Sequence, residues 1–295
     1  MPELPEVETI RHGLNELIAG KKITAVSFDW PKSFPNDSTL TDAFMIGASI
    51  RQVRRRAKVL IIDFDNEYSV ITHLKMTGQL VYRSPDVNFG AGHPSASLIG
   101  NLPDKSTRVV IDFSDGSKLF FNDQRKFGWM RLLPTVEIKN IDFFKKVGPE
   151  PLEPGFTWLE LRKQLMRRKN LKIKAALLDQ TVVAGIGNIY ADESLWGAKI
   201  HPERIVNSLS AREIHKLYDE ILFVLRLSIE KGGSTDKNYV NHEGKKGSYL
   251  EFARVFRREH MPCPRCQTEI VKIRVAGRGT HICPSCQKLR SNKTV

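Results

Sequence analysis

The residues with the clearest chemical potential stand at the start of the chain. Once Met1 is removed, Pro2 carries a free secondary amine, which condenses with an aldehyde to give an iminium. Glu3 and Glu6 follow within one helical turn, and carboxylates move protons beside an amine nucleophile. An α-amine titrates at about pH 8, so a usable fraction is neutral at working pH. The alternative is structural, because Pro5 and the acidic residues after it suit the start of a helix.

The four cysteines form a second group, Cys263-Pro-Arg-Cys266 and Cys283-Pro-Ser-Cys286. Their C-x2-C-x16-C-x2-C spacing predicts a tetrahedral zinc site. Disulfides are the alternative, but the chain begins with acidic residues and no signal region, so we expect a cytosolic protein with reduced thiols. Four thiolates leave no open coordination position, which predicts one structural Zn²⁺ and no metal chemistry. His260 and His281 are not needed as ligands and are expected to face phosphate or solvent.

The charge of the chain is strongly positive. There are 46 Lys and Arg against 33 Asp and Glu, and residues 245–295 alone hold 12 basic and 3 acidic residues. A second basic cluster surrounds Lys58 and includes Arg54, Arg55 and Arg56. Such charge favours a polyphosphate partner, although a passive basic surface is the alternative. No apolar run of about 18 residues, basic amphipathic helix or lipidation motif indicates a membrane partner.

The elements that must position these residues fall into successive parts. Residues 1–19 begin with an amphipathic helix, with Val7, Ile10 and Leu14 at helical spacing. Short strands are then predicted, and Asp115-Gly116 indicates a hairpin turn between two of them. This pattern predicts an antiparallel β-sandwich, with a long loop from Tyr82 to Arg108. The predicted strands are Ile23–Phe28, Val59–Phe64, Ser69–Leu74, Arg108–Phe113 and Ser117–Phe121.

The second half of the chain is predicted to be helical. Residues 147–155 are rich in Pro and Gly and predict a linker, which sets the expected parts at 1–146, 156–250 and 251–295. Thr157-x-x-Glu160 and Ser210-x-x-Glu213 are capping boxes for two helices. Between these helices, Gly185-Ile-Gly-Asn188 allows a tight double turn whose amides can face a phosphate. A plain helix–helix connection is the alternative at this point.

Taken together, these motifs resemble the formamidopyrimidine-DNA glycosylase family, and the match runs in order along nearly the whole chain. The fold implied is α+β and multidomain, with an N-terminal antiparallel β-sandwich and flanking helix, a helix–two-turn–helix domain and a C-terminal zinc finger, and DNA in the cleft. The matching segments are residues 2–8, Arg56-Ala-Lys58, His73-Leu-Lys-Met76, Gln124-Arg-Lys-Phe127, Gly185-Ile-Gly-Asn-Ile-Tyr-Ala-Asp-Glu193 and Val275-Ala-Gly-Arg-Gly-Thr280.

The resemblance implies a role for each matching residue. Pro2 is the expected nucleophile at C1′ of the damaged nucleotide, Glu3 its proton-transfer partner and Glu6 a supporting carboxylate. Lys58 and Arg278 are expected in the catalytic set and, with His73 and Asn188, on phosphates around an extruded nucleotide. Lys174 is also expected to bind DNA. The side chains expected to fill the base stack that the extruded nucleotide leaves are Met76, Arg125 and Phe127. Without the resemblance, Met76 and Phe127 would be interpreted as core residues.

The resemblance implies a bifunctional DNA glycosylase and AP lyase of bacterial base-excision repair. It would remove 8-oxoguanine opposite cytosine and formamidopyrimidines, through a Schiff base on Pro2 and β,δ-elimination, as a monomer in the cytoplasm or nucleoid. The alternatives are a non-catalytic reader of damaged or abasic DNA and an endonuclease VIII-type enzyme for oxidised pyrimidines. Two segments depart from the family pattern: 84–105 is longer than usual, and 232–248 is poorly matched over the loop that covers the extruded base.

Overall fold

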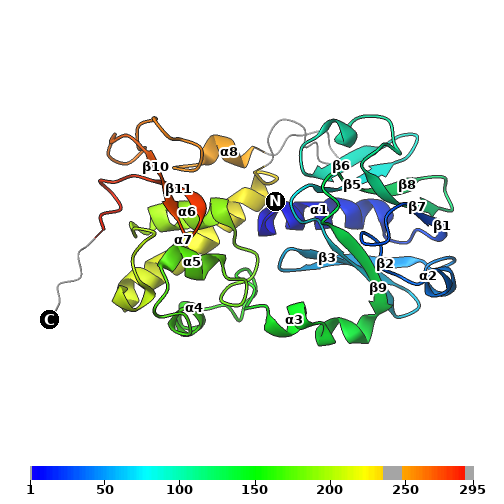
Figure 1. The fold of residues 1–295 in the computed structure, drawn as a ribbon, viewed down its shortest axis with the longest axis horizontal. Coiled ribbons are helices and arrows are strands. Elements are labelled where there is room, and N and C mark those ends of the chain that lie inside the picture. The colour runs from blue at the N-terminus through cyan, green and yellow to red at the C-terminus, as the bar shows by residue number, and fades with distance from the viewer. Residues whose placement is uncertain (1, 235–247, 290–295) are drawn as a thin grey trace. The chain divides into compact units, whose positions relative to one another are not determined.

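A computed structural model describes residues 2–234 and 248–289 of the chain (Figure 1). The chain divides into two compact units. The first comprises residues 1–145 and 229–248, and the second comprises residues 146–228 and 249–295. The three domains predicted from the sequence, residues 1–146, 156–250 and 251–295, remain a prediction.

Helix α1 (Leu4–Ile18) covers the beginning of the first unit, as the apolar spacing predicted. Val7, Ile10, Leu14 and Ile18 are at most 1% exposed and lie in the main core of this unit. A Cβ on Gly13 would lie 2.6 Å from the Phe89 ring, so this glycine permits the close approach of α1 to the sheet. Burial of one face therefore fixes the helix, and with it the position of its N-terminus.

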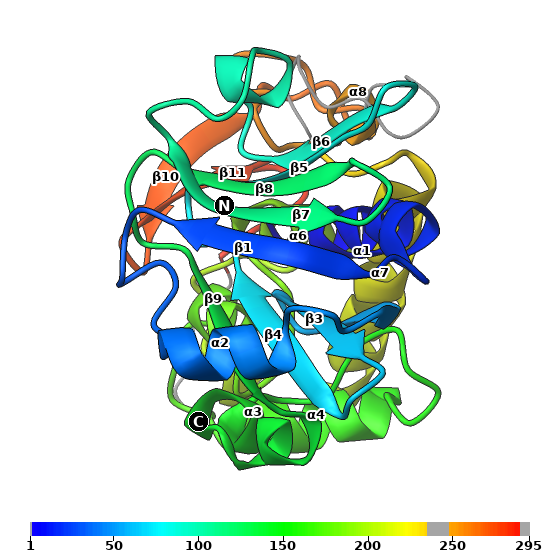
Figure 2. The same cartoon turned by 90° about the vertical axis from the view of Figure 1, so that its right-hand side faces the viewer.

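Two antiparallel sheets make up most of the rest of the first unit, which confirms the predicted sandwich (Figure 2). Residues from both sheets share one core, including Ile62 and Val70 from one sheet and Leu80, Leu119 and Phe121 from the other. One sheet has the order β1 (Ile23–Phe28), β7 (Thr107–Phe113), β8 (Lys118–Asp123), β5 (Gly78–Arg83), β6 (Asn88–Gly92), and the other β2 (Ile50–Arg56), β3 (Val59–Phe64), β4 (Tyr68–His73), β9 (Trp129–Pro134).

Two of the places where the chain passes from one sheet to the other are neighbours. The chain leaves β4 for β5 through residues 74–77 and returns from β8 to β9 through residues 124–128. Strand β4 pairs with β9, with His73 opposite Trp129, and β5 pairs with β8, with Gly78 opposite Asp123. Because both pairings begin at the crossing points, the two connecting turns lie side by side. We call residues 74–77 the first crossover turn and 124–128 the second.

The predicted long loop between Tyr82 and Arg108 is wrong in part. It contains strand β6, which pairs with β5, and the short 3-10 helix η1 (Ala96–Leu98). Glycines at positions 90 and 92 weaken the strand signal in the sequence. Leu98 packs on Val81 and Phe120, so this segment covers the outer face of the five-stranded sheet. The other short elements of the first half are α2 (Ser38–Phe44), η2 (Thr135–Asn140) and α3 (Asp142–Lys146).

The second unit is helical and ends in a β-hairpin. Thr157 and Ser210 accept backbone hydrogen bonds from Glu160 and Glu213, which confirms both predicted caps. The hairpin strands β10 (Val271–Val275) and β11 (Arg278–Ile282) follow α8 (Tyr249–Phe252). The remaining helices are α4 (Trp158–Met166), α5 (Ile173–Leu178), α6 (Asn188–Gly197), η3 (Val206–Ser208) and α7 (Ala211–Glu230). No helix in the described residues has the length and apolar character of a membrane span.

Candidate functional site

The N-terminus of α1 gathers the three residues of the predicted amine site. Glu3 is the N-cap residue and forms a capping box with Glu6, and a proline occupies the first turn. Pro2 is buried and Glu3 is only 4% exposed. The backbone nitrogen of Glu3 donates to Glu6 Oε2 at 2.8 Å. The capping interaction therefore serves local folding, and it also orients a carboxylate next to Pro2.

Glu6 is held by a second partner from far along the chain. Its Oε1 accepts hydrogen bonds from the backbone nitrogen and the hydroxyl of Ser234, each at 2.8 Å. A Cβ on Gly233 would lie 3.2 Å from Glu6 Cγ, and the φ of +88° also favours glycine there. Both carboxylate oxygens of Glu6 thus bind fixed donors. This arrangement fits a positioning role better than a proton shuttle. The rest of the predicted covering loop, residues 235–247, lies outside the described residues, as does Met1.

Lys58 lies in the turn that leads into β3, and His73 ends the neighbouring strand β4. Lys58 belongs to the two-residue turn between β2 and β3, in which Ala57 has a φ of 54°. Val59 pairs with His73, so the turn brings the lysine to the end of β4. Lys58 is 6% exposed, and its charge acts on the His73 ring. The structure therefore brings together two of the predicted phosphate contacts.

His73 is a neutral donor in this setting. Burial lowers its pKa to about 3, and the positive charges of Lys75 and Lys58 add to the lowering. Its Nδ1 accepts a hydrogen bond from the backbone nitrogen of Lys75 at 3.0 Å. The ring proton is therefore on Nε2, which can donate to a phosphate oxygen without carrying charge.

Met76, Arg125 and Phe127 lie on the two crossover turns. Met76 is 40% exposed and Phe127 is 56% exposed, so neither belongs to the core. The Arg125 guanidinium lies 4.9 Å from the centre of the Phe127 ring. The alternative interpretation of Met76 and Phe127 as core residues is thus wrong. Apolar side chains that stay exposed at the tips of rigid turns are suited to contact a flat apolar partner.

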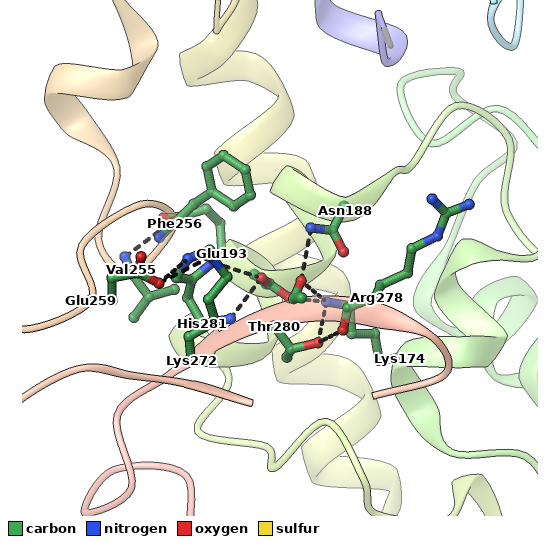
Figure 3. A network of polar contacts seen from close by, with 12 residues as sticks. Lys174, Asn188, Glu193, Val255, Phe256, Glu259, Lys272, Arg278, Thr280 and His281 are labelled. Carbon is green, nitrogen blue, oxygen red and sulfur yellow. Dashed lines mark hydrogen bonds and ion pairs between the residues drawn. The ribbon is translucent and has the colours of Figure 1, made fainter. Parts of the chain in front are cut away.

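Asn188 and Arg278 lie together in the second unit. Asn188 is the first residue of α6, after the turn in which Gly185 has a φ of 82°. Its amide nitrogen donates to the Gly279 carbonyl at 3.0 Å, and within the described residues the second hydrogen of that amide has no acceptor. Arg278 begins β11, is exposed, and extends away from the bonded groups in Figure 3. The start of a helix and a guanidinium together form an anion-binding surface.

Lys174 does not lie on that surface, and the prediction that it contacts DNA directly needs correction. Its side chain is 0% exposed, and its ammonium donates to Asp192 Oδ1 and Thr280 Oγ1, both at 2.6 Å (Figure 3). It also reaches the Gly279 carbonyl at 3.3 Å. A buried lysine needs such a partner, so Lys174 holds the hairpin residues beside Arg278 in place.

His281 is also buried, contrary to the expectation that it faces phosphate or solvent. It is 4% exposed, and its backbone nitrogen donates to Asp192 Oδ2 at 2.9 Å. Its ring lies 5.1 Å from the ring of Phe256 and 3.4 Å from Glu259 Oε2 (Figure 3). The place of His281 in β11 explains this, because the strand runs from exposed Arg278 to a buried end that meets α6. His260, by contrast, is exposed.

Asp192, Glu193 and Ser234 are structural partners that the sequence reasoning missed. Glu193 is 0% exposed and accepts from the backbone nitrogens of Arg254, Val255 and Phe256. Consecutive carboxylates on α6 therefore bind the segment before the first cysteine pair and the hairpin between the two cysteine pairs. The signal was present in the motif Tyr190-Ala-Asp-Glu193, because two acids on an otherwise buried helix require partners.

The four cysteines fit a single zinc ion. Their sulfur atoms all lie within 4.8 Å of one another. Three sulfur–sulfur distances are 4.0, 3.5 and 3.4 Å. Four sulfurs at about 2.3 Å from a tetrahedral zinc would be about 3.8 Å apart, whereas a disulfide requires about 2.05 Å. The geometry and the thiolate donor set therefore match one structural zinc ion that closes the finger around Cys263 and Cys283, which are both buried.

Three sequence profiles match the chain in order. The formamidopyrimidine-DNA glycosylase N-terminal domain matches residues 1–130, and the H2TH domain of formamidopyrimidine-DNA glycosylase matches residues 147–239. The zinc finger found in FPG and IleRS matches residues 262–289. The three profiles thus cover the regions of the amine site, the Asn188 turn and the cysteines.

Full-length relatives and solved structures agree with these profiles. The chain is 42% identical to the formamidopyrimidine-DNA glycosylases of Pediococcus pentosaceus and Pelotomaculum thermopropionicum, over 98% of this chain and 100% of each relative. A Lactococcus lactis FPG mutant in complex with a Fapy-dG containing DNA matches with a TM-score of 0.86 and 37% identity, over 98% of this chain and 100% of that chain. MutM in complex with carbocyclic 8-oxo-G containing DNA matches with a TM-score of 0.84 and 38% identity, with the same coverage.

Proposed function

The chain belongs to the formamidopyrimidine-DNA glycosylase family, and from this premise we propose that it removes oxidised purines from double-stranded DNA and then cleaves the strand. The proposed substrates are formamidopyrimidines and 8-oxoguanine opposite cytosine. The DNA in the similar complexes contains Fapy-dG or carbocyclic 8-oxo-G, and the Lactococcus lactis enzyme has also been solved with abasic-site DNA, which supports this substrate class.

The proposed chemistry begins at Pro2. The neutral amine attacks C1′ of the damaged nucleotide, the new C–N bond replaces the glycosidic bond, and the base leaves with the bonding electrons and a proton. Opening of the sugar between C1′ and O4′ gives an iminium, with a proton delivered to O4′. Loss of a C2′ proton then expels the 3′ phosphate, and a second elimination expels the 5′ phosphate.

The roles of the neighbouring residues follow from their contacts. Glu3, next to Pro2 and almost fully buried, is the proposed proton donor for O4′. Glu6 is the proposed positioning residue, because both its oxygens are bound to Glu3 and Ser234. Lys58 and Arg278 supply positive charge, while His73 and Asn188 supply neutral donors for phosphate oxygens. Lys174 acts on DNA only through the hairpin that it supports.

One observation carries this proposal: Pro2 is buried directly before a helix whose N-cap is Glu3, within a capping box closed by Glu6. A protein that only binds damaged DNA does not need an amine and a carboxylate held together in this way. The zinc ion holds the finger in its fold and takes no part in the reaction, because four thiolates complete its coordination. We further propose that the protein acts as a monomer in the bacterial cytoplasm and nucleoid.

The decisive experiment is borohydride reduction of the full-length protein on DNA with a single abasic site. Protein from which Met1 has been removed should give a stable covalent adduct, and peptide mapping should place it on the Pro2 nitrogen. Glu3→Gln should excise 8-oxoguanine at least a hundredfold more slowly, because the amide keeps the shape and cannot donate the proton.

Protein that retains Met1 is the matched control, since its Pro2 nitrogen is an amide without nucleophilicity. An adduct of normal yield with that protein would contradict the proposal and point to Lys58 as the nucleophile. Tight binding of lesion DNA with no adduct from the processed protein would favour the non-catalytic reader.

A further inference from the structure

The two crossover turns are built alike. Each contains a lysine in the left-handed backbone region, Lys75 with a φ of 50° and Lys126 with a φ of 58°. A glycine without room for a side chain directly follows the first turn, and another is the last residue of the second turn. A Cβ on Gly78 would lie 2.3 Å from the Leu74 carbonyl oxygen, and a Cβ on Gly128 would lie 2.8 Å from the Phe121 ring. Both turns therefore have a fixed shape that leaves an apolar tip exposed.

The second crossover turn is closed by the carboxylate of Asp123. Asp123 is 0% exposed, and its Oδ2 accepts from the Gly128 nitrogen at 2.6 Å. Its Oδ1 accepts from the Arg125 nitrogen at 3.2 Å. One buried carboxylate thus binds both ends of the segment that contains Arg125 and Phe127, and such charge-assisted hydrogen bonds are the stronger kind.

The same carboxylate reaches the first crossover turn through Thr77. The Thr77 hydroxyl donates to Asp123 Oδ1, and its oxygen lies 3.2 Å from the Arg125 nitrogen. Thr77 directly follows Met76. A side-chain contact therefore links the residue next to Met76 with the backbone that positions Arg125.

Lys126 anchors the second crossover turn from its other side. Its ammonium lies 4.1 Å from the centre of the Trp30 ring, a cation–π contact just after the end of β1. Lys126 is thereby held against the segment that follows β1, while its neighbours Arg125 and Phe127 contact each other at the exposed end of the turn. The turn is held at Asp123 and at Lys126, so its tip has little freedom to shift.

We propose that the Thr77–Asp123 contact makes the two crossover turns a single positioning unit, which sets how Met76, Arg125 and Phe127 enter the vacated stack together and how Arg125 reads the opposite base. This inference rests on the proposed function for the substrate. Thr77 and Asp123 are positioning residues and touch no DNA in this account. Without the link, Met76 would move independently of Arg125. The hydrogen bond from the Arg125 guanidinium to the edge of the opposite base would then be less well aligned.

The test compares Thr77→Val with Thr77→Ser. Valine keeps the shape of threonine and loses the hydroxyl, whereas serine keeps the hydroxyl. The measurement is single-turnover excision of 8-oxoguanine opposite cytosine and opposite adenine. Thr77→Val should lower the cytosine-over-adenine ratio by about tenfold, Thr77→Ser should restore most of it, and Thr39→Val, an exposed threonine of α2, should leave it unchanged.

Two further measurements separate positioning from general damage and from failure of the function. Borohydride trapping on single-stranded abasic DNA, which has no opposite base, should be equal in wild type and Thr77→Val. Amide hydrogen exchange of residues 124–128 should be faster in Thr77→Val, although the substitution lies in the other turn.

An unchanged base ratio and unchanged exchange in Thr77→Val would overturn the inference. An equal loss for Thr77→Ser, or a parallel loss of trapping, would overturn it as well. Faster exchange in a protein whose wild type excises no oxidised purine would leave the positioning unit standing and refute the proposed function instead.

Discussion

The two compact units hold their proposed site residues in different ways. In the first unit, Glu3 and His73 are oriented by hydrogen bonds with nearby backbone, and His73 remains uncharged. In the second unit, the fully buried ion pair Lys174–Asp192 holds the hairpin residues next to Arg278, which Asn188 also contacts, and the four cysteines flank that hairpin in the sequence. Glu3, the proposed proton donor, and His73, a phosphate contact that stays neutral, are thus oriented by uncharged backbone groups. The phosphate contacts of the second unit are supported instead by two opposite charges that compensate each other.

This comparison predicts that metal removal has the largest effect on DNA binding and that the loss of folded structure is confined to the second unit. Cys283→Ser should lose the single zinc ion, the hairpin order and most DNA affinity, because structural zinc sites contribute about 10–16 kcal/mol of apparent binding free energy. Zinc is measured by elemental analysis, and hydrogen exchange should rise in β10 and β11 while that of β3 and β4 stays unchanged. Iron, or fully active protein without metal, would contradict this assignment.

The buried ion pair comes next in expected size. Asp192→Asn leaves the Lys174 ammonium buried without its carboxylate and should lower the free energy of unfolding by about 3–5 kcal/mol, as measured by urea denaturation. Asp219→Asn, the same change at an exposed position of α7, should cost less than about 0.5 kcal/mol. Lys174→Met combined with Asp192→Leu should recover part of the loss, since both charges are then gone. Equal stability of the two single variants would show that the pair is not a structural support.

Much of both units could be predicted from local sequence, and the failures have a common cause. The helix of residues 4–18, the N-caps at Thr157 and Ser210 and the cysteine site depend on residues close in sequence, so their spacing was sufficient. Strand β6 was missed because glycines mask its pattern, and only pairing with β5 reveals it. Lys174 was misplaced for a similar reason. A lysine looks solvent-exposed until Asp192 and Thr280, far along the chain, are seen to surround its ammonium.

The exposed side chain of Arg125 on the second crossover turn predicts an effect on selectivity for the opposite base and not on folding stability. Arg125 is exposed and presents a planar donor, and cytosine offers acceptors at O2 and N3 that suit a guanidinium better than the edge of adenine does. Arg125→Ala should lower the cytosine-over-adenine excision ratio by about ten- to a hundredfold, because a good paired contact is worth about 1–3 kcal/mol. Single-turnover excision opposite all four bases checks this. A ratio that survives the substitution would reduce Arg125 to a structural or phosphate-binding residue.

The smallest expected effect concerns charge at the phosphate contacts and compares one residue from each unit. Arg278→Ala should reduce the slope of log affinity against log salt by about one, since one cation no longer displaces counterions. His73→Asn should weaken binding without changing that slope, because the folded protein holds His73 neutral. Lys58→Ala is the control within the first unit and should behave like Arg278→Ala. The measurement is fluorescence anisotropy on abasic-site DNA at several salt concentrations.

The pH dependence of DNA binding and of folding stability gives a second test that His73 is neutral. With a pKa of about 3 in the folded state, His73 stays neutral from pH 8 to pH 5.5, so its contact with DNA should not strengthen on acidification. The unfolded chain binds a proton at this histidine below about pH 6.5. The unfolded state then holds more protons than the folded state, so folding stability falls as the pH drops from about 6.5 toward 3. Wild type should therefore lose about 2 kcal/mol more than His73→Asn between pH 8 and pH 5 in urea unfolding. If His73→Asn lowers the salt slope by one, or if wild type and variant share the same acid dependence, His73 is charged in the folded protein and the contrast between the two units fails at this residue.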